Sequence, residues 1–289
     1  MLRQTFLFLS RRRALRRWME TSRAAARLTS RFVAGQTLDD VLGVSARLQQ
    51  AGLLATLDHL GENVTTTDEA RASRDAMLEA LGEIHRRGLT ATISIKLTQF
   101  GLDLGDAVCR ANVEAVVRRA AELGNRVEID MESSEYTSRT LAMVEAMHSL
   151  CGCVRAVVQA YLHRTADDIA RLNSLAIPVR LCKGAYKEPP SAAFQAKRDV
   201  DANYLKLARL LLDRGVQPAF ATHDPAMIRV VLPHARQQGA GPDRFEFQML
   251  YGVRRDLQQQ LAASGFRVRL YVPYGDAWYP YFMRRLAER

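Results

Sequence analysis

Several short apolar runs of this 289-residue sequence carry polar side chains two residues apart, a spacing that places them on one face of a strand. Within the run from Thr92 to Lys96, the two isoleucines face one way, and Thr92, Ser94 and Lys96 face the other. Polar residues that flank one apolar neighbour or end a run occur elsewhere too: Glu128, Asp130, Gln159, Arg180, Thr222, His223, Glu246, Gln248, Arg269 and Tyr271. Buried polar groups are costly unless they pair or bind a polar ligand. We therefore expect a functional site among them.

Cationic side chains are the second part of this pattern: Lys96, Arg180, Lys183, Arg284 and Arg285. An arginine fork can bind a carboxylate through two hydrogen bonds. The small residues of Lys183-Gly184-Ala185, which follow a strand, allow the backbone to approach a phosphate closely. Thr222-His223 ends the next run. We expect a phosphate and, separately, a carboxylate as ligands.

The position of each polar residue within its run separates structure from function. In barrels of parallel strands, active sites lie at the carboxyl ends of the strands. Glu128, Glu246 and Arg269 fall earlier in their runs and are expected to form interior salt bridges. The residues expected to act on a ligand are Lys96, Asp130, Gln159, Arg180 and Tyr271.

The runs that must position these residues alternate with longer segments whose apolar residues have helical spacing. The eight runs are Leu54–Leu57, Thr90–Leu97, Val127–Met131, Ala156–Leu162, Pro178–Cys182, Pro218–Thr222, Phe245–Leu250 and Val268–Val272. Alternating strands and helices predict a parallel sheet, and eight units predict a closed α/β (β/α)₈ barrel. The sequence contains neither a GxGxxG nor a GxxxxGK[ST] motif, which argues against the nucleotide folds that use them.

Helix boundaries support this reading and suggest how the chain is divided. An acidic first turn opens a helix at Thr67, and Asp224-Pro225 opens another with proline in the first turn. Thr165 is expected to cap a third. We predict an N-terminal helical cap over residues 1–50 and a barrel catalytic domain over residues 51–289.

Composition excludes some classes of protein and leaves the N-terminus open. Hydrophobic residues make up 48% and charged residues 25% of the chain, and no apolar run is long enough to span a bilayer. The net charge of +10 is partly local to an arginine-rich N-terminus, where a solvated helical face, a lipid-binding patch, and a transit peptide or nucleic-acid arm remain alternatives. No basic stripe with aromatic residues indicates nucleic acid in the rest of the chain. The four cysteines lack metal-type spacing, so we expect reduced thiols and no metal.

Five segments of the sequence carry a resemblance to a known family. They are Val179–Tyr186, with its RLCKGAY sequence, Phe220–Asp224, Phe245–Gly252, Tyr271–Gly275 and Tyr281–Glu288. From about Leu54 to Arg289, the sequence resembles the proline dehydrogenase family in its short, monofunctional bacterial form. The resemblance implies a distorted (β/α)₈ barrel that holds FAD. It also implies oxidation of L-proline to Δ¹-pyrroline-5-carboxylate, the first step of proline catabolism, with hydride transfer to flavin N5 and electrons passed on to a membrane quinone.

The same resemblance implies roles for individual residues. Asp130 and Arg180 would be catalytic, with Arg180 beside the flavin ring. The substrate would be bound by Lys96, Leu250, Tyr271, Tyr281, Arg284 and Arg285. The cofactor would be bound by Met131, Gln159, Arg180, Lys183, Gly184, Ala185, Thr222 and His223. Glu62 would gate the site, and Glu288 would support Arg285 through an i,i+3 ion pair.

Three further expectations concern the whole protein. Because Arg284 and Arg285 follow the last strand, the final helix should fold over the barrel mouth. We expect a cytoplasmic protein, with peripheral association with the inner face of the membrane as an open alternative and pyrroline-5-carboxylate dehydrogenase as a downstream partner. The chain ends at Arg289, directly after the predicted substrate helix, which leaves open whether a further segment follows. The rival function is a (β/α)₈ aldolase or lyase in which Lys96 forms a Schiff base.

Overall fold

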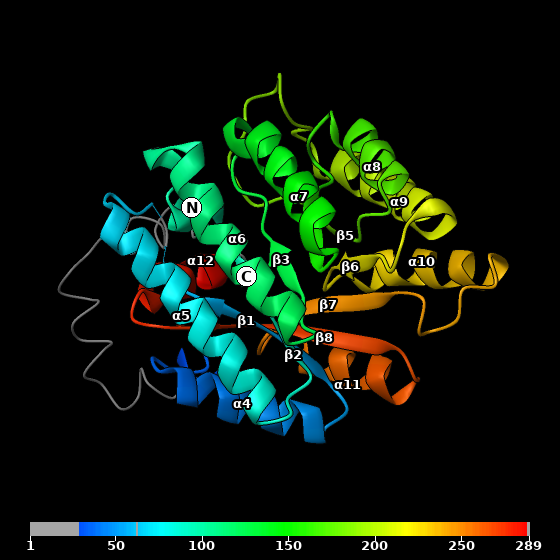
Figure 1. Ribbon diagram of the computed structural model, residues 1–289. Helices are drawn as coiled ribbons and strands as arrows, with labels where there is room; N and C mark the ends of the chain where they lie inside the picture. The colour runs from blue at the N-terminus through cyan, green and yellow to red at the C-terminus, as the bar shows by residue number, and fades with distance from the viewer. Residues whose placement is uncertain (1–28, 62, 288–289) are drawn as a thin grey trace.

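The computed structural model describes residues 29–61 and 63–287, with the last four of these described in their backbone only. Eight parallel strands close into a barrel in the order of the sequence (Figure 1). The strands are β1 Leu54–His59, β2 Ala91–Ile95, β3 Val127–Ile129, β4 Val154–Gln159, β5 Val179–Cys182, β6 Ala219–Ala221, β7 Glu246–Leu250 and β8 Arg267–Tyr274. The expected (β/α)₈ fold is therefore confirmed.

Helices alternate with the strands and surround the barrel (Figure 1). The α-helices are α4 Leu38–Gln50, α5 Thr67–Arg86, α6 Asp106–Glu122, α7 Thr137–Cys151, α8 Thr165–Ser174, α9 Lys197–Arg214, α10 Pro225–Gln237, α11 Arg255–Ala263 and α12 Trp278–Ala287. The short 3₁₀ helices are η1 Leu97–Phe100, η2 Leu102–Leu104 and η3 Ser134–Tyr136. Side-chain caps explain two of the predicted starts: Thr66 and Glu69 form a capping box at α5, and Asp224 accepts a hydrogen bond from the backbone of Ala226 at α10.

The predicted cap at Thr165 is wrong. Thr165 is the first helical residue of α8, and the preceding Arg164 makes no side-chain cap. The Thr165 hydroxyl instead donates a 2.6 Å hydrogen bond to the backbone oxygen of Gln159, the last residue of β4. This bond fixes the turn between β4 and α8, because it joins the end of the strand to the start of the helix.

The strand faces divide as the alternating pattern predicts. Ile93 and Ile95 are buried in the apolar core that lies between the strands and the helices. Thr92 faces the interior of the barrel, where it contacts Thr56 of β1 and Arg269 of β8. Side chains of opposite chemistry therefore occupy the two faces of β2, and polar groups from β1, β2 and β8 meet inside the barrel.

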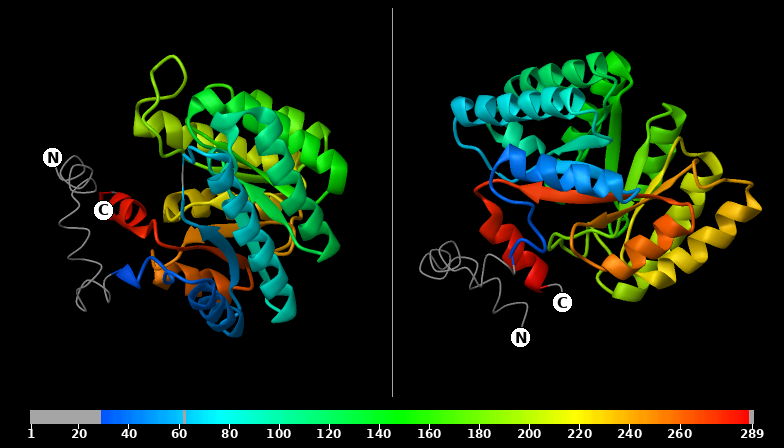
Figure 2. Two further views of the ribbon diagram at one scale, coloured as in Figure 1. Left: turned by 60° about the vertical axis from the view of Figure 1, so that its left-hand side comes forward. Right: turned by 90° about the horizontal axis from the view of Figure 1, so that it is seen from below.

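Two helices occupy unusual places around β8. α4, which precedes the first strand, packs against β1 and β8 in the outer ring. α12, which follows β8, packs instead in a second apolar cluster with Leu60, just beyond β1, and with Phe32 and Val33. Figure 2 shows α12 (red) beside the blue segment that precedes α4. The last helix therefore covers the carboxyl ends of β8 and β1, as expected.

The segment before α4 is hydrogen-bonded to the carboxyl end of β8. Ala34 donates a backbone hydrogen bond to Pro273, and Gly35 accepts one from Gly275. Gly252 has a φ of 77°, and a Cβ there would lie 1.7 Å from the backbone oxygen of Arg31, so only glycine permits this approach. The proposed division at residue 50 stays a prediction, since residues 1–28 lie outside the described part of the chain.

Candidate active site

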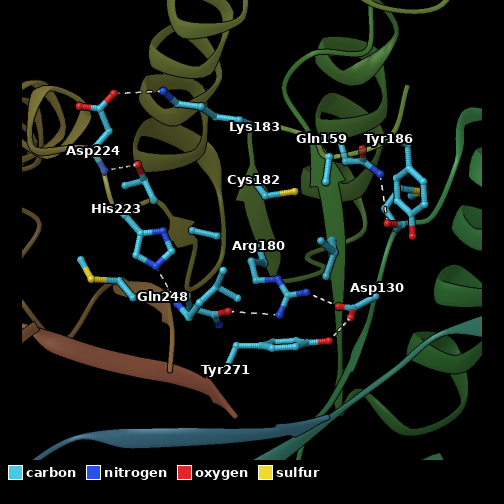
Figure 3. A pocket seen from close by; sticks show the side chains of 18 of the residues that line it. Asp130, Gln159, Arg180, Cys182, Lys183, Tyr186, His223, Asp224, Gln248 and Tyr271 are labelled. Atoms are coloured by element: carbon cyan, nitrogen blue, oxygen red, sulfur yellow. Dashed lines mark hydrogen bonds and ion pairs between the residues drawn. The ribbon is translucent and has the colours of Figure 1, made fainter. Parts of the chain in front are cut away.

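One cavity of about 840 Å³ opens at the carboxyl ends of the strands (Figure 3). Its walls contain most of the site residues predicted from the sequence: Lys96, Asp130, Met131, Gln159, Arg180, Lys183, Gly184, Ala185, Thr222, His223, Leu250 and Tyr271. Further lining residues were not predicted as part of the site: Val157, Cys182, Tyr186, Ala221, Asp224, Gln248 and Met249. The size lies within the roughly 300–1,000 Å³ range of ligand pockets. The fold thus gathers residues from seven of its strand ends around one space.

Asp130 lies at the centre of the polar groups. Its Oδ1 accepts hydrogen bonds from Arg180 and, at 2.7 Å, from the Ser94 hydroxyl, and its Oδ2 accepts one of 2.6 Å from the Tyr271 hydroxyl. Burial by itself would raise the pKa of Asp130, but the charges of Arg180 and Lys96 outweigh it and lower that pKa. Asp130 is therefore an ionised carboxylate near neutral pH, and it acts as an acceptor.

Arg180 joins this carboxylate to the interior of the barrel. Its guanidinium donates to Asp130, to Glu128 Oε2 at 2.6 Å and to Gln248 Oε1 at 3.3 Å, as Figure 3 shows for Asp130 and Gln248. Its carbon Cζ also lies 5.4 Å from the centroid of the Tyr271 ring. Burial would lower the pKa of Arg180, but Asp130 and Glu128 outweigh it and raise that pKa. The guanidinium is a fixed positive charge in the cavity wall.

Lys96 has a partner that the sequence did not indicate. Its Nζ donates a 2.9 Å hydrogen bond to Asp58 Oδ1, and lies 3.3 Å from the Tyr271 hydroxyl and 3.7 Å from Asp130 Oδ2. Asp58 was not predicted from the sequence because the first apolar run ends at Leu57, whereas β1 continues to His59. Alternation from Thr56, which faces the interior, would have placed Asp58 on the same face.

The other side of the cavity is built on backbone groups and the ends of helices. His223 Nε2 accepts a 2.8 Å hydrogen bond from the backbone of Leu250, and Thr222 Oγ1 accepts one of 3.1 Å from the backbone of Asp224. Lys183 Nζ donates to Asp201 at 2.5 Å and to Asp224 at 3.1 Å. These bonds fix the loops after β5 and β6 in place, so the predicted phosphate-side residues do meet at one wall.

Gln159 offers one hydrogen-bonding atom that the protein does not satisfy. Its Nε2 donates to the backbone oxygens of Met131 and Glu132, at 3.1 and 2.7 Å. Its Oε1 is buried and has no hydrogen-bond partner among the described residues. An unpaired buried acceptor in a cavity wall is costly unless a ligand donates to it. The site is therefore suited to a ligand that carries an N–H group at this wall.

The cavity also contains a cysteine, Cys182 on β5. Burial raises the pKa of its thiol to about 11, so the thiol stays protonated near neutral pH. Among the described residues, no group of His, Cys, Asp and Glu side chains is arranged to hold a metal ion. The cavity therefore supplies neither a reactive thiolate nor, in this part of the chain, a metal centre.

Some of the predicted site residues are not among the described residues that line the cavity. Tyr281 is buried in the second apolar cluster of α12. The side chains of Arg284 and Arg285, and the whole of Glu62 and Glu288, lie outside the described residues. Their proposed roles in binding and gating thus stay predictions.

Below the cavity, a second set of charges fills the barrel interior. Arg155 of β4 is 1% exposed and contacts Glu246 as well as Glu128, the latter at 2.8 Å. Arg269 Nε lies 3.0 Å from Glu246 Oε1. The expected interior salt bridges of Glu128, Glu246 and Arg269 are thus confirmed, and Arg155 is the partner that the sequence did not single out.

Comparisons with known proteins identify the family to which the sequence is similar. Residues 41–289 match the sequence profile of the family described as proline dehydrogenase. The chain is 38% identical over 291 residues to proline dehydrogenase 1 of Bacillus subtilis subsp. natto, a match that covers 100% of this chain and 95% of the relative. It is 38% identical over 266 residues to proline dehydrogenase of Deinococcus radiodurans, covering 90% of this chain and 86% of the relative.

Solved structures of longer proteins share the fold. Proline utilization A from Bdellovibrio bacteriovorus matches with a TM-score of 0.85 at 24% identity, over 91% of this chain and 33% of that one. Proline utilization A from Bradyrhizobium japonicum matches with a TM-score of 0.80 at 26% identity, over 92% and 31%. This chain thus spans about a third of those proteins, whereas it spans nearly all of the single-function relatives. By sequence and by fold, the chain belongs to the proline dehydrogenase family, in its monofunctional bacterial form.

Proposed function

We propose that this protein uses FAD to oxidise L-proline to Δ¹-pyrroline-5-carboxylate. The observation that carries the proposal is the division of one cavity into two walls of different chemistry. One wall has backbone groups, Lys183 and the open acceptor of Gln159, and the other has the Lys96 ammonium beside Asp130 and Tyr271. Membership of the family supports the substrate. The two walls suit two ligands that must meet between them.

The hydrogen-bond donors and acceptors on the cofactor side of the cavity fit a flavin dinucleotide. Gln159 Oε1 would accept from the ring's N–H, and Arg180 and Met131 would flank the ring. Lys183, Gly184, Ala185, Thr222 and His223 would hold the ribityl and phosphate portion. Bound FAD would supply the two-electron acceptor for hydride from the carbon next to the ring nitrogen of proline.

The substrate side would bind proline by its carboxylate. Lys96 carries one charge for that purpose, and Arg284 and Arg285 on α12 would supply two more. Leu250, Tyr271 and Tyr281 would shape the slot for the pyrrolidine ring. Binding energy from a carboxylate remote from the reacting bond can fix the orientation of the reacting carbon. Glu62 would gate the site, and Glu288 would support Arg285.

Asp130 contributes by orienting its neighbours. Because it stays ionised, it holds both the Arg180 guanidinium and the Tyr271 hydroxyl by charge-assisted hydrogen bonds. The guanidinium would lie beside the flavin and the phenol beside the substrate. Arg180 would then stabilise negative charge that develops on the reduced cofactor, since it is a fixed and buried cation.

Electrons would leave the protein to a membrane quinone, with the chain in the cytoplasm and in peripheral contact with the membrane. Among the described residues, no helix is both long and apolar enough to cross a bilayer. The product would pass to a pyrroline-5-carboxylate dehydrogenase. The Schiff-base alternative is not favoured, because Lys96 lies between two carboxylates that stabilise its ammonium form, whereas a Schiff base needs the neutral amine.

An absorption spectrum of the purified protein tests the proposal. The protein should be yellow, with the two visible bands of an oxidised flavin, and anaerobic addition of L-proline should bleach them. L-Lactate, which has a carboxylate and no ring nitrogen, is the matched control and should leave the spectrum unchanged. A protein reconstituted with FAD that keeps its bands in excess proline would overturn the proposal.

A further inference from the structure

Asp58 is a buried carboxylate that the reaction proposed above does not use. It lies on β1, is 2% exposed, and is not part of the cavity wall. Its register partners are Ser94, two residues before Lys96 on β2, and Pro273, two residues after Tyr271 on β8, so Asp58 lies between the strands that carry these two cavity residues. Burying a second carboxylate near Asp130 is unfavourable, because like charges repel and both lose hydration. Such a residue calls for a compensating role.

The contact that Asp58 makes points to that role. Lys96 Nζ is 2.9 Å from Asp58 Oδ1, but 3.7 Å from Asp130 Oδ2, so the ammonium is hydrogen-bonded to Asp58 and only near Asp130. Asp130 already accepts from Ser94, Arg180 and Tyr271. Without Asp58, Asp130 would be the nearest acidic side chain to Lys96 among the ion pairs of the described residues. A direct Lys96–Asp130 pair would compete with the bonds from Arg180 and Tyr271.

We propose that Asp58 is a positioning residue: it holds the Lys96 ammonium off Asp130, in the orientation that receives the carboxylate of proline. The inference rests on the proposed function, because it assumes that Lys96 binds that carboxylate. Asp58 does not line the cavity, and in this proposal it acts through the Lys96 ammonium that it binds, although the Tyr271 hydroxyl also lies near its carboxylate. Burial, and next the nearby charge of Asp130, raise the pKa of Asp58 despite Lys96, which agrees with a carboxylate retained at a cost in stability.

Steady-state kinetics of the flavin-loaded protein with a soluble electron-accepting dye would test this. Asp58→Ala should raise the KM for L-proline about tenfold, the scale of one hydrogen bond to a charged group, with kcat changed less than about twofold. Asp58→Asn keeps an acceptor oxygen of the same shape and should raise KM less. If the alanine variant does not fold, the asparagine variant decides, and an unchanged or lowered KM overturns the proposal.

A double-mutant cycle shows whether Asp58 acts through Lys96. In a Lys96→Met background, Asp58→Asn should cause no further rise in KM. An equal further rise would overturn the proposal, because Asp58 would then act independently of the ammonium. Pyrrolidine, which has the ring amine but no carboxylate, provides a second readout. Asp58→Asn should leave its oxidation rate unchanged, and an equal loss with pyrrolidine would show a merely structural role.

Asp168→Asn is the matched control variant. Asp168 is also a largely buried carboxylate, paired with Arg164 at 2.9 Å, but it lies on α8 away from the cavity. It should leave both KM and kcat for proline unchanged. A wild-type protein that binds FAD but does not turn over proline overturns the proposed function and this inference together. Turnover by the wild type with an unchanged KM in both Asp58 variants overturns the inference alone.

Discussion

The barrel contains two sets of buried charges at different depths, and they are used differently. In the deeper set, Glu128, Arg155, Glu246 and Arg269 pair with one another and none of them lines the cavity. In the upper set, Asp130, Lys96 and Arg180 also pair, but each of the three lines the cavity. Both sets combine cations with carboxylates. What differs is whether one side of the set faces a space that a ligand can enter.

Arg180 connects the two sets, since it binds Glu128 of the deeper set and Asp130 of the upper set. A cation held from two sides has little freedom to move, so the deeper charges help to fix the position of a group in the cavity wall. The comparison suggests that the deeper set determines stability and rigidity, whereas the upper set determines ligand affinity. The following substitutions separate these effects.

The largest expected effect is on folding, from Arg155→Met. Removing this cation leaves the carboxylates of Glu128 and Glu246 in the interior with less compensation, which costs about 3–5 kcal/mol for a broken buried pair. Denaturant unfolding would measure the loss. Arg171→Met on α8 is the control, because Arg171 is exposed in its pair with Glu145 and solvent screens the charges, so the loss should be much smaller. Equal losses in the two variants would contradict a special role for the deeper set.

Gln159→Met tests the open acceptor of the cavity wall. We expect the Kd for FAD to rise about 10- to 100-fold, because the variant loses a hydrogen bond and leaves the N–H group of the flavin ring without an acceptor. Quenching of flavin fluorescence would measure this Kd. Gln258→Met is a closely matched control: Gln258 is as buried, and its Nε2 also donates to two backbone oxygens, at 3.1 and 2.7 Å, but it does not line the cavity. FAD binding weakened equally in both variants would assign the effect to folding.

Tyr271→Ser should change specificity more than stability. The phenol ring lines the cavity and its hydroxyl binds Asp130, so the serine variant enlarges the slot proposed for the pyrrolidine ring. We expect the ratio of kcat/KM for hydroxyproline to that for proline to rise about tenfold, the scale of a small pocket change. Tyr274→Ser, on the same strand but outside the cavity wall, should leave the ratio unchanged. An unchanged ratio in Tyr271→Ser would refute the ring-slot assignment.

The sequence predicted the barrel and much of its cavity, because both follow from local patterns. Alternation assigned each strand residue to a face, and the order of strands brought Asp130, Arg180 and Tyr271 to one end. What it could not provide were partners distant along the chain. Lys96 and Asp58 are 38 residues apart, and Arg155 and Glu246 are 91 apart. The strand end at His59 was also missed, since an acidic residue interrupts the apolar run.

The smallest expected effect is a pH-dependent gain in stability on Asp58→Asn. The pKa of Asp58 is higher in the folded protein than in the unfolded chain. Between these two pKa values the folded protein holds more protons than the unfolded chain, so the free energy of unfolding falls as pH rises. The asparagine variant lacks this loss. Its stability relative to wild type should therefore be unchanged in acid. It should increase as pH rises from the unfolded to the folded pKa of Asp58, by about 1.4 kcal/mol for each pH unit that separates the two values.

Glu246→Gln should change stability with pH in the opposite direction. Burial would raise the pKa of Glu246, but the charges of Arg269 and Arg155 outweigh burial and lower that pKa. A carboxylate of this kind contributes stability above its unfolded pKa and loses it as pH falls towards the folded value. Urea unfolding at several pH values would distinguish the two variants. If Asp58→Asn lost stability near neutral pH, as Glu246→Gln should, Asp58 would belong with the deeper set. A gain in stability combined with a higher KM would instead mean that this carboxylate is kept for binding, at the expense of folding.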